Sequence, residues 1–243
     1  MKNLIKYFLQ KILGFKNYLF IFSVFKIKTL RIDKKEKDFF HFLNLIPENA
    51  VLLDIGANLG IMTVHLARKV KNGFVFAFEP MPENLNILNR ISSHYNLKNV
   101  KIFDFALGEK NEQIKMIMPV ISSVKMQGLS HVLHSEISEF NDGTIFSVEC
   151  KRLDDIEEIQ NTKKISAIKI DVENFEYFVL KGGEKIIAGN KPLIYIELWE
   201  NENRKKCFDF FYRLNYSIHV VESGKLMRFD SAKHKNQNFI ILP

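Results

Sequence analysis

Two acidic residues early in the chain each follow a short apolar run. Asp54 follows the run 51–53 and opens the segment DIGANLG, and Glu79 follows the run 74–78. Glycine permits positive φ and lets backbone N–H groups come close to a ligand. An acid roughly 20 residues after such a glycine turn accepts hydrogen bonds from ribose hydroxyls in dinucleotide folds. The pattern therefore predicts a nucleotide-type cofactor site at the carboxyl ends of two neighbouring strands.

The loop chemistry favours S-adenosylmethionine over a nicotinamide cofactor. A pyrophosphate is usually held by G-x-G-x-x-G, whereas this loop reads G-x-N-x-G and follows an acid. Asp54 would repel a pyrophosphate and attract the sulfonium and ammonium groups of S-adenosylmethionine. We predict that Glu79 binds the ribose and that Pro80, which ends the strand, belongs to the same site. The residues expected around the methionine moiety are Asp54, Gly56, Ala57, Asn58 and Gly60.

The adenine ring should lie against the end of a third strand, predicted over residues 100–106. Asp104 and Phe105 are successive residues, and successive side chains of a strand point to opposite faces. Only one of them can therefore face the ring. We expect Asp104 to do so, because a carboxylate accepts a hydrogen bond from the adenine amino group. Phe105 and Ala106 are the other wall residues expected there.

Carboxylates at the ends of two later strands are the candidate catalytic groups. Asp171 ends the apolar run 165–171, Glu173 lies two positions later, and Glu197 ends the run 194–196. Strand carboxyl ends face the cofactor cleft, where a carboxylate can accept the proton of an attacking hydroxyl. Asp171 and Glu173 also suit a second role, because Asp is a favoured N-cap and Glu is favoured in the first turn of a helix.

Six motifs in order resemble the FkbM family of S-adenosylmethionine-dependent methyltransferases. They are DIGANLG (54–60), FAFEP (76–80), ALGEK (106–110), IKIDVEN (168–174), LKGG (180–183) and IELWE (196–200). The resemblance implies a class I methyltransferase fold and O-methylation of a hydroxyl, commonly on a sugar or natural product. The family usually reads DVEG where this chain has Asn174. Asparagine tolerates the left-handed conformation that glycine adopts there.

A parallel sheet is needed to bring these strand ends together. Strand and helix patterns alternate, which predicts an α/β fold with a mostly parallel, seven-stranded sheet and helices on both faces. Residues 46–243 are predicted to form this single domain. The expected strands are 51–54, 74–79, 100–106, 165–171, 191–198, 216–221 and 239–242, and the expected helices are 59–70, 82–95, 175–188 and 202–214. Residues 113–118 and 144–151 suit antiparallel strands, and 120–143 suits a loop over the substrate site.

Basic charge is concentrated in the predicted helical extension, residues 1–45. The chain has a net charge of +7, and residues 1–40 carry ten Lys/Arg against three Asp/Glu, so the remainder is balanced. A nucleic-acid enzyme needs basic surface around its active site, and we therefore predict no nucleic-acid partner. Residues 1–30 suit either a helix lying on an anionic membrane or a helix packed on the domain. The apolar face is predicted from Leu4, Ile5, Phe8, Ile12, Phe15 and Leu19.

The remaining composition bears on location and metal binding. Cys150 and Cys207 are far apart in the sequence, as expected of free thiols in a reducing compartment. His131 and His134 lack the spacing of a helical zinc site, so no metal is predicted. No uncharged apolar run reaches the ~18 residues that span a membrane. We predict a cytoplasmic protein, with peripheral contact at the inner membrane face as the other possibility.

These observations predict an O-methyltransferase acting on a hydroxyl of a sugar, glycan or related small molecule, with surface-polysaccharide biosynthesis as the expected pathway. One alternative is a module that binds S-adenosylmethionine without turnover, with Asn174 marking a decayed site. The presence of Asp171 and Glu173 argues against it. The other alternative is an NAD(P)-dependent oxidoreductase, which the first loop disfavours.

Overall fold

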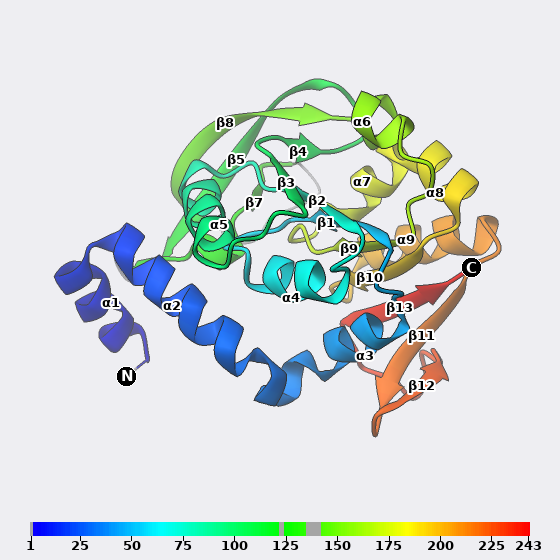
Figure 1. Ribbon diagram of the computed structural model, residues 1–243, viewed down its shortest axis with the longest axis horizontal. Helices are drawn as coiled ribbons and strands as arrows, with labels where there is room; N and C mark the ends of the chain where they lie inside the picture. Colours follow the sequence, from blue (N-terminus) through cyan, green and yellow to red (C-terminus); the bar gives the residue numbers. More distant parts are fainter. Residues whose placement is uncertain (1, 122–123, 135–141) are drawn as a thin grey trace.

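The computed structural model describes residues 2–121, 124–134 and 142–243, and it is built around an eight-stranded, mostly parallel sheet (Figure 1). The strand order is β12-β11-β13-β10-β9-β1-β2-β3. The bounds are β1 (Val51–Ile55), β2 (Phe74–Phe78), β3 (Val100–Phe103), β9 (Ala167–Ile170), β10 (Leu193–Glu197), β11 (Ser217–Glu222), β12 (Lys225–Arg228) and β13 (Asn238–Leu242). The strands β3, β2, β1, β9 and β10 run parallel to one another. The strands β13, β11 and β12 pair with their neighbours in antiparallel orientation.

The predicted parallel sheet is confirmed, but the expected count of seven strands is wrong by one. The extra strand, β12, is the return arm of a hairpin with β11. Ser223 and Gly224 connect the two strands with φ of 51° and 78°. Two successive positive φ values are those of the two-residue turn that matches strand twist. Ser-Gly was therefore a turn signal that the sequence interpretation missed.

The carboxyl ends of β1 and β9 mark the place where the connections change direction. From β1 the chain moves outward to β2 and β3, and the later strands β9 and β10 are added on the other side of β1. Ligands of open α/β sheets bind at such a switch point. The middle strands are buried on both faces. All four residues of β9 are buried, which explains why its sequence is apolar throughout except for one lysine.

Helices cover both faces, as predicted. One face packs against α3 (Lys37–Leu45), α4 (Ile61–Lys69) and α5 (Pro82–His94), and the other against α7 (Glu176–Gly182), α8 (Glu184–Asn190) and α9 (Glu202–Arg213). The single helix expected over 175–188 is two helices. A Cβ on Gly182 would lie 1.8 Å from the Gly108 carbonyl oxygen, and one on Gly183 would lie 2.8 Å from Leu153. These glycines let the chain pack closely where α7 gives way to α8.

A second, smaller sheet crosses one side of the molecule (Figure 1). It contains β4 (Ala106–Leu107), β5 (Glu112–Ile121), β6 (Val124–Lys125) and β8 (Gly143–Lys151), and β7 (His131–Val132) pairs with β5. The two predicted antiparallel strands are therefore present. The strand expected over 100–106 is wrong at its end, because β3 stops at Phe103 and Ala106 pairs with Cys150 of β8. In the predicted loop 120–143, the short helix η3 (Gln127–Leu129) is present, and residues 122–123 and 135–141 lie outside the described residues.

Residues of the predicted N-terminal extension form α1 (Lys2–Leu13), α2 (Phe15–Thr29), η1 (Leu30–Ile32), η2 (Lys34–Glu36) and α3. The expectation of one continuous apolar face through Leu19 is wrong. Gly14, with φ of 73°, separates α1 from α2, so Ile12 is 77% exposed while Leu19 is completely buried. The helices α1 and α2 lie side by side, and α2 packs on α4 and α5 (Figure 1). In the part of the chain described here, no helix combines the length and hydrophobicity needed to cross a membrane.

Candidate active site

The loop between β1 and α4 is held in a conformation that needs glycine. Gly56, Asn58 and Gly60 have φ of 76°, 51° and 81°. A Cβ on Gly56 would lie 1.9 Å from the Asp171 carbonyl oxygen, so only glycine permits this approach to the end of β9. The N–H groups of Gly56 and Ala57 both donate to the Phe78 carbonyl, at 3.1 and 2.9 Å. The loop is therefore fixed against the ends of two neighbouring strands.

Asp54 lies beneath this loop. Its side chain is completely buried, and Oδ2 accepts a hydrogen bond from Thr63 Oγ1 at 2.6 Å. Its other oxygen lies 3.4 Å from Lys169 Nζ. Asp54 lines neither of the two cavities described below. The cation beside Asp54 in this structure thus belongs to the protein, and a contact between Asp54 and the cofactor stays a prediction.

Glu79, at the end of β2, is buried and organises the loop from the other side. Its oxygens accept from the backbone N–H groups of Asn58 at 2.7 Å and Met81 at 2.9 Å, and from Asn84 Nδ2 at 3.3 Å. Burial raises the pKa of Glu79 to about 7, although the bonds from Met81 and Asn58 oppose this. A carboxylate oxygen accepts more than one hydrogen bond, so Glu79 retains capacity for ligand hydroxyls.

A first cavity opens between the loop, the end of β2 and η3. Its volume is about 50 Å³, or about 590 Å³ if the open solvent at its mouth is included. Four of its polar atoms are buried without a hydrogen-bond partner among the described residues: Asn58 Oδ1, Asn84 Oδ1, Gln127 Oε1 and Ser130 Oγ. Buried polar atoms normally have partners. Their convergence on one cavity fits a polar ligand rich in hydrogen-bonding groups.

The far wall of this cavity is apolar. Phe105 and Ala106 line it, and the Phe105 ring packs 5.9 Å from the ring of Phe78 and 5.3 Å from that of Phe103. Asp104 is exposed and does not line the cavity. The expectation for Asp104 is therefore not met. Phe103 and Phe105 alternate with it and both turn inward, so the aromatic residue takes the place that was expected for the acid.

A second cavity, of about 400 Å³, adjoins the first. The two share part of their lining: Gly56, Asn58, Gln127, Gly128 and Asp171. Residues of α2, η2 and α4 complete the second cavity, so the N-terminal extension supplies part of its wall. Asp171 is the only one of the three predicted catalytic carboxylates that lines both cavities; Glu173 lines the first alone, and Glu197 lines neither.

Lys169 is a site residue that the sequence interpretation missed. It is buried in β9, directly opposite Asp54 in the register of β1 and β9. Its ammonium donates to the Gly56 carbonyl at 2.7 Å and lies 3.7 Å from Asp171 Oδ2. Burial alone would lower the pKa of Lys169, but Asp54 and Asp171 outweigh it and the pKa is raised. One buried cation thus joins the loop to the carboxylate at the junction of the cavities.

The carboxyl groups of Glu173 and Glu197, near Asp171, have raised pKa values. Burial raises the pKa of Glu173 well above its ordinary value, and Asp171 and Glu197 add to the effect. Burial also raises the pKa of Glu197, followed by Asp171. Like charges this close cannot all be ionised at low cost. Burial and the neighbouring carboxylates therefore favour the protonated form of Glu173.

Helix capping, the alternative role for Asp171 and Glu173, is not what these side chains do: the N-cap of α7 is Phe175, and no side chain makes a cap bond there. The helix α7 begins at Glu176, whose Oε1 accepts from the backbone N–H groups of Val172 at 3.1 Å and Asn174 at 3.2 Å. Burial raises the pKa of Glu176 to about 8. Asp171 and Glu173 make no such capping bond among those found in the described chain. Their side chains are therefore available to the cavities.

Asn174 keeps the turn that glycine usually provides. It has φ of 75°, and Glu173 beside it has φ of 52°. Asn174 Oδ1 accepts from Asn201 Nδ2 at 2.7 Å and from Asn203 Nδ2 at 3.1 Å. The side chain that replaces a glycine hydrogen is thus bonded to the start of α9. The substitution has not collapsed the segment that carries Asp171.

Comparison with known proteins decides the family. The sequence profile of the Methyltransferase FkbM domain matches residues 54–229. The chain belongs to the FkbM methyltransferase family. The predicted resemblance is therefore confirmed, and the match includes the loop, Glu79 and all three predicted catalytic carboxylates.

Individual proteins similar to this chain also carry the name methyltransferase. The chain is 27% identical over 150 residues to "Methyltransferase 1" of Beauveria bassiana, covering 56% of this chain and 59% of that protein. It is 24% identical over 177 residues to "Methyltransferase sdnD" of Sordaria araneosa, covering 64% and 68%. The match to the first relative thus spans less than two thirds of that protein. The crystal structure of methyltransferase FkbM from Methylobacillus flagellatus aligns with a TM-score of 0.55 at 17% identity, covering 82% of this chain and 44% of that one. That alignment confirms the class I methyltransferase fold.

Proposed function

We propose that this FkbM-family protein is an S-adenosylmethionine-dependent O-methyltransferase, with the methyl donor in the first cavity and a hydroxyl acceptor in the second. The observation that carries the proposal is the position of Asp171 at the junction of the two cavities. A group that removes a proton from the acceptor must lie within hydrogen-bond reach of its hydroxyl, close to the place where the donor and acceptor sites meet. Among the predicted catalytic carboxylates, Asp171 alone lies there.

The first cavity suits the chemical parts of S-adenosylmethionine. Phe105 and Ala106 offer an apolar wall to the adenine, and Glu79 offers carboxylate oxygens to the ribose hydroxyls. The unpartnered oxygens of Asn58 and Gln127 are acceptors suited to the ammonium of the methionine part. When bound, S-adenosylmethionine supplies a methyl group already activated by its sulfonium.

A nicotinamide cofactor fits this loop poorly. The backbone N–H groups that would hold a pyrophosphate already have acceptors within the protein: Gly56 and Ala57 donate to Phe78, Asn58 donates to Glu79, and Gly60 donates to Ala57. The Glu79 carboxylate beside them would also repel a phosphate when ionised. The structure therefore favours the methyl donor over NAD(P).

Residues of the chain itself supply the base, the balancing charge and the positioning that methyl transfer needs. Asp171 accepts the proton of the acceptor hydroxyl, and Lys169 balances the charge of Asp171 and holds it in place. Glu173, protonated because of its burial, donates a hydrogen bond within the first cavity. Glu197 acts through its charge on Glu173 and does not contact either ligand. Asn58, Gln127 and Gly128 separate the two cavities and fix the direction of approach.

The acceptor is proposed to be a sugar, glycan or related small molecule. This choice rests on the family resemblance. The proposed surface-polysaccharide pathway rests on that resemblance and on the basic N-terminal helices, and the proposed cytoplasmic location rests on the two free cysteines. The second cavity adds that the acceptor has an apolar face, because much of its lining is hydrophobic. The apolar lining residues are Phe22, Leu30, Ile61, Met62, Met126 and Leu129.

Two measurements test the proposal. Calorimetric titration with S-adenosylmethionine and with NADH should show binding of the methyl donor alone, and preferential binding of NADH would overturn the assignment. Incubation with S-adenosylmethionine and extracted glycans or small molecules should give a product heavier by one methylene. Donor binding without transfer to any fraction would favour the inactive module, against which the intact turn at Asn174 argues.

A further inference from the structure

The outer surface of α1, α2 and η1 is unusually apolar for a surface in contact with water. Within the described residues, ten large hydrophobic side chains are exposed, and six of them lie between positions 8 and 32. Ile12 is 77% exposed, Phe25 61% and Ile32 81%. Scattered single residues of this kind are normal, but clusters mark interaction surfaces. The six are Phe8, Leu9, Ile12, Ile21, Phe25 and Ile32.

The geometry of α2 separates this surface from the protein core. Leu19, Ser23 and Ile27 recur at every fourth position and are buried against the domain. Ile21 and Phe25 are also four apart and lie on the opposite side of the helix, where they are exposed. Packing on the domain therefore accounts for one face of α2 and leaves the second apolar face unexplained.

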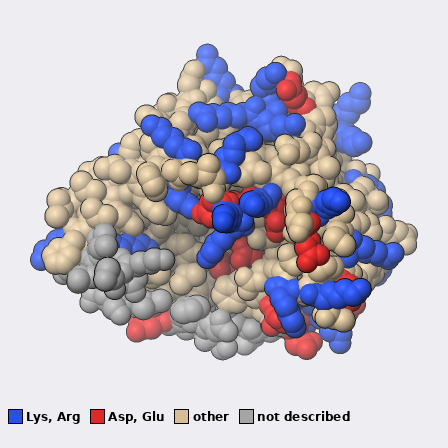
Figure 2. All heavy atoms as spheres, turned by 90° about the horizontal axis from the view of Figure 1, so that it is seen from below, with Lys and Arg blue, Asp and Glu red and all other residues tan. Residues whose placement is uncertain are grey.

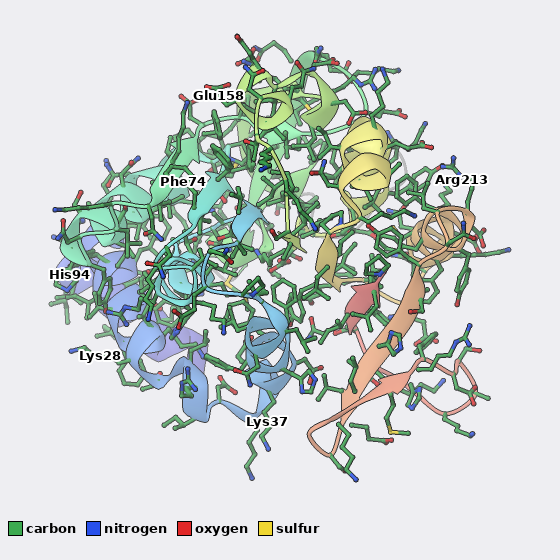
Figure 3. The ribbon with its side chains drawn as sticks, turned by 45° about the vertical axis from the view of Figure 1, so that its right-hand side comes forward. Lys28, Lys37, Phe74, His94, Glu158 and Arg213 are labelled. Atoms are coloured by element: carbon green, nitrogen blue, oxygen red, sulfur yellow. The ribbon has the colours of Figure 1, made fainter. Side chains whose placement is uncertain are left out.

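The charged residues of α1, α2 and η1 are all basic, and the first acid, Asp33, follows Ile32 and pairs with Lys26 at 2.8 Å. Residues 1–32 contain seven Lys/Arg and no Asp/Glu. Lys11, Lys16 and Lys28 are exposed beside the apolar residues. The side chains of Lys28 and of Lys37, at the start of α3, project outward from the body (Figure 3). On the face seen from below, Lys and Arg are scattered widely, whereas Asp and Glu lie mostly in the middle and along the lower edge (Figure 2).

We propose that this surface binds an anionic lipid bilayer from one side, without crossing it. We define the docking surface as Leu9, Ile12, Ile21, Phe25 and Ile32 with Lys11, Lys16 and Lys28. Apolar side chains flanked by lysines, on helices without acidic residues, match the boundary between acyl chains and anionic headgroups. A second copy of the chain is a poorer partner. A two-fold interface would place the same surface on both sides, and two clusters of lysines without acids would face each other.

Vesicle sedimentation tests the proposal without depending on enzyme activity. The full chain should sediment with vesicles of phosphatidylcholine and phosphatidylglycerol, much less with phosphatidylcholine alone, and less as salt rises. The variant Ile12→Ser/Ile21→Ser/Phe25→Ser should lose binding. The matched control, Ile145→Ser/Met227→Ser, changes exposed residues elsewhere and should bind like the wild type.

Charge variants separate electrostatic attraction from apolar insertion. Each lysine near an anionic surface strengthens binding ~5-fold, so Lys11→Gln/Lys16→Gln/Lys28→Gln should weaken it ~100-fold. The exposed lysines Lys98, Lys163 and Lys164 lie outside the docking surface, and their triple Gln variant should bind normally. Circular dichroism and melting would verify that all variants are folded. Absence of binding, equal binding by test and control variants, or a dimer that the apolar variant abolishes would each overturn the proposal.

Discussion

Replacing Lys169 with Met should destabilise the protein strongly, since it leaves buried carboxylates without their cation. Lys169 is 3% exposed and Asp54 is completely buried, with their charged atoms 3.4 Å apart. Removing one partner of a buried ion pair costs about 3–5 kcal/mol. Most of this comes from Asp54, because the side chain of Asp171 is 31% exposed and water screens it. For a chain of this size, the melting temperature should fall on the order of 10 °C.

The assay is denaturant unfolding of the wild type, Lys169→Met, Asp54→Asn and the double variant. The double variant removes both charges, so it should be clearly more stable than the sum of the two single losses predicts. Lys163→Met, at an exposed lysine, should change stability by less than about 0.5 kcal/mol. A loss below about 1 kcal/mol in Lys169→Met, or strict additivity in the double variant, would refute the reasoning.

Three further predictions concern Glu79, Gly56 and Asn174. Folding raises the pKa of Glu79 from 4.5 to about 7, so its contribution to stability falls as pH rises between these values, by about 3 kcal/mol at most. Unfolding measured from pH 4 to 8 should show a weaker fall in Glu79→Gln, and parallel curves would disprove the assignment. Gly56→Ala should abolish binding of S-adenosylmethionine, since its Cβ would meet the Asp171 carbonyl; calorimetry showing wild-type affinity would contradict this. Asn174→Gly should keep the turn and methyl transfer but lose about 1 kcal/mol of stability, because Asn201 loses its bond to Asn174 Oδ1 while Asn203 keeps its bond to the Asn174 carbonyl. Unchanged melting would show that those bonds are unimportant.

Local patterns predicted the parts of the site that lie on one stretch of chain. The glycine loop and Glu79 could be placed because apolar run, turn and acid are adjacent in the sequence. The surroundings of Asp54 could not be predicted, for the opposite reason. Its cation, Lys169, is distant along the chain, and only the parallel register of β1 and β9 brings the two residues face to face. The lysine inside the otherwise apolar run 168–170 was the available signal, because a buried lysine needs a carboxylate as its partner.

The other corrections have similar causes. Asp104 was favoured on the assumption that β3 continues to 106, but the chain leaves the sheet after Phe103 to pair with β8. Glu176 was missed because its partners, the N–H groups of Val172 and Asn174, belong to the turn before α7, whose conformation the sequence pattern did not reveal. The helical extension was treated as one helix although Gly14 was a visible breaker. That break determines which apolar residues are buried and which form the docking surface.

The most direct test of the account is the catalytic constant of Asp171→Asn, measured on the methylated fraction together with calorimetric affinity for S-adenosylmethionine. Loss of a positioned general base should lower the rate ~10²–10⁴-fold, with donor affinity within a few-fold of the wild type. Glu173→Gln, which keeps a neutral polar group, and Glu197→Gln, which removes a charge that is proposed to contact neither ligand, should lose much less. Methyl transfer by Asp171→Asn at the wild-type rate would contradict the proposal that this carboxylate acts between the two cavities.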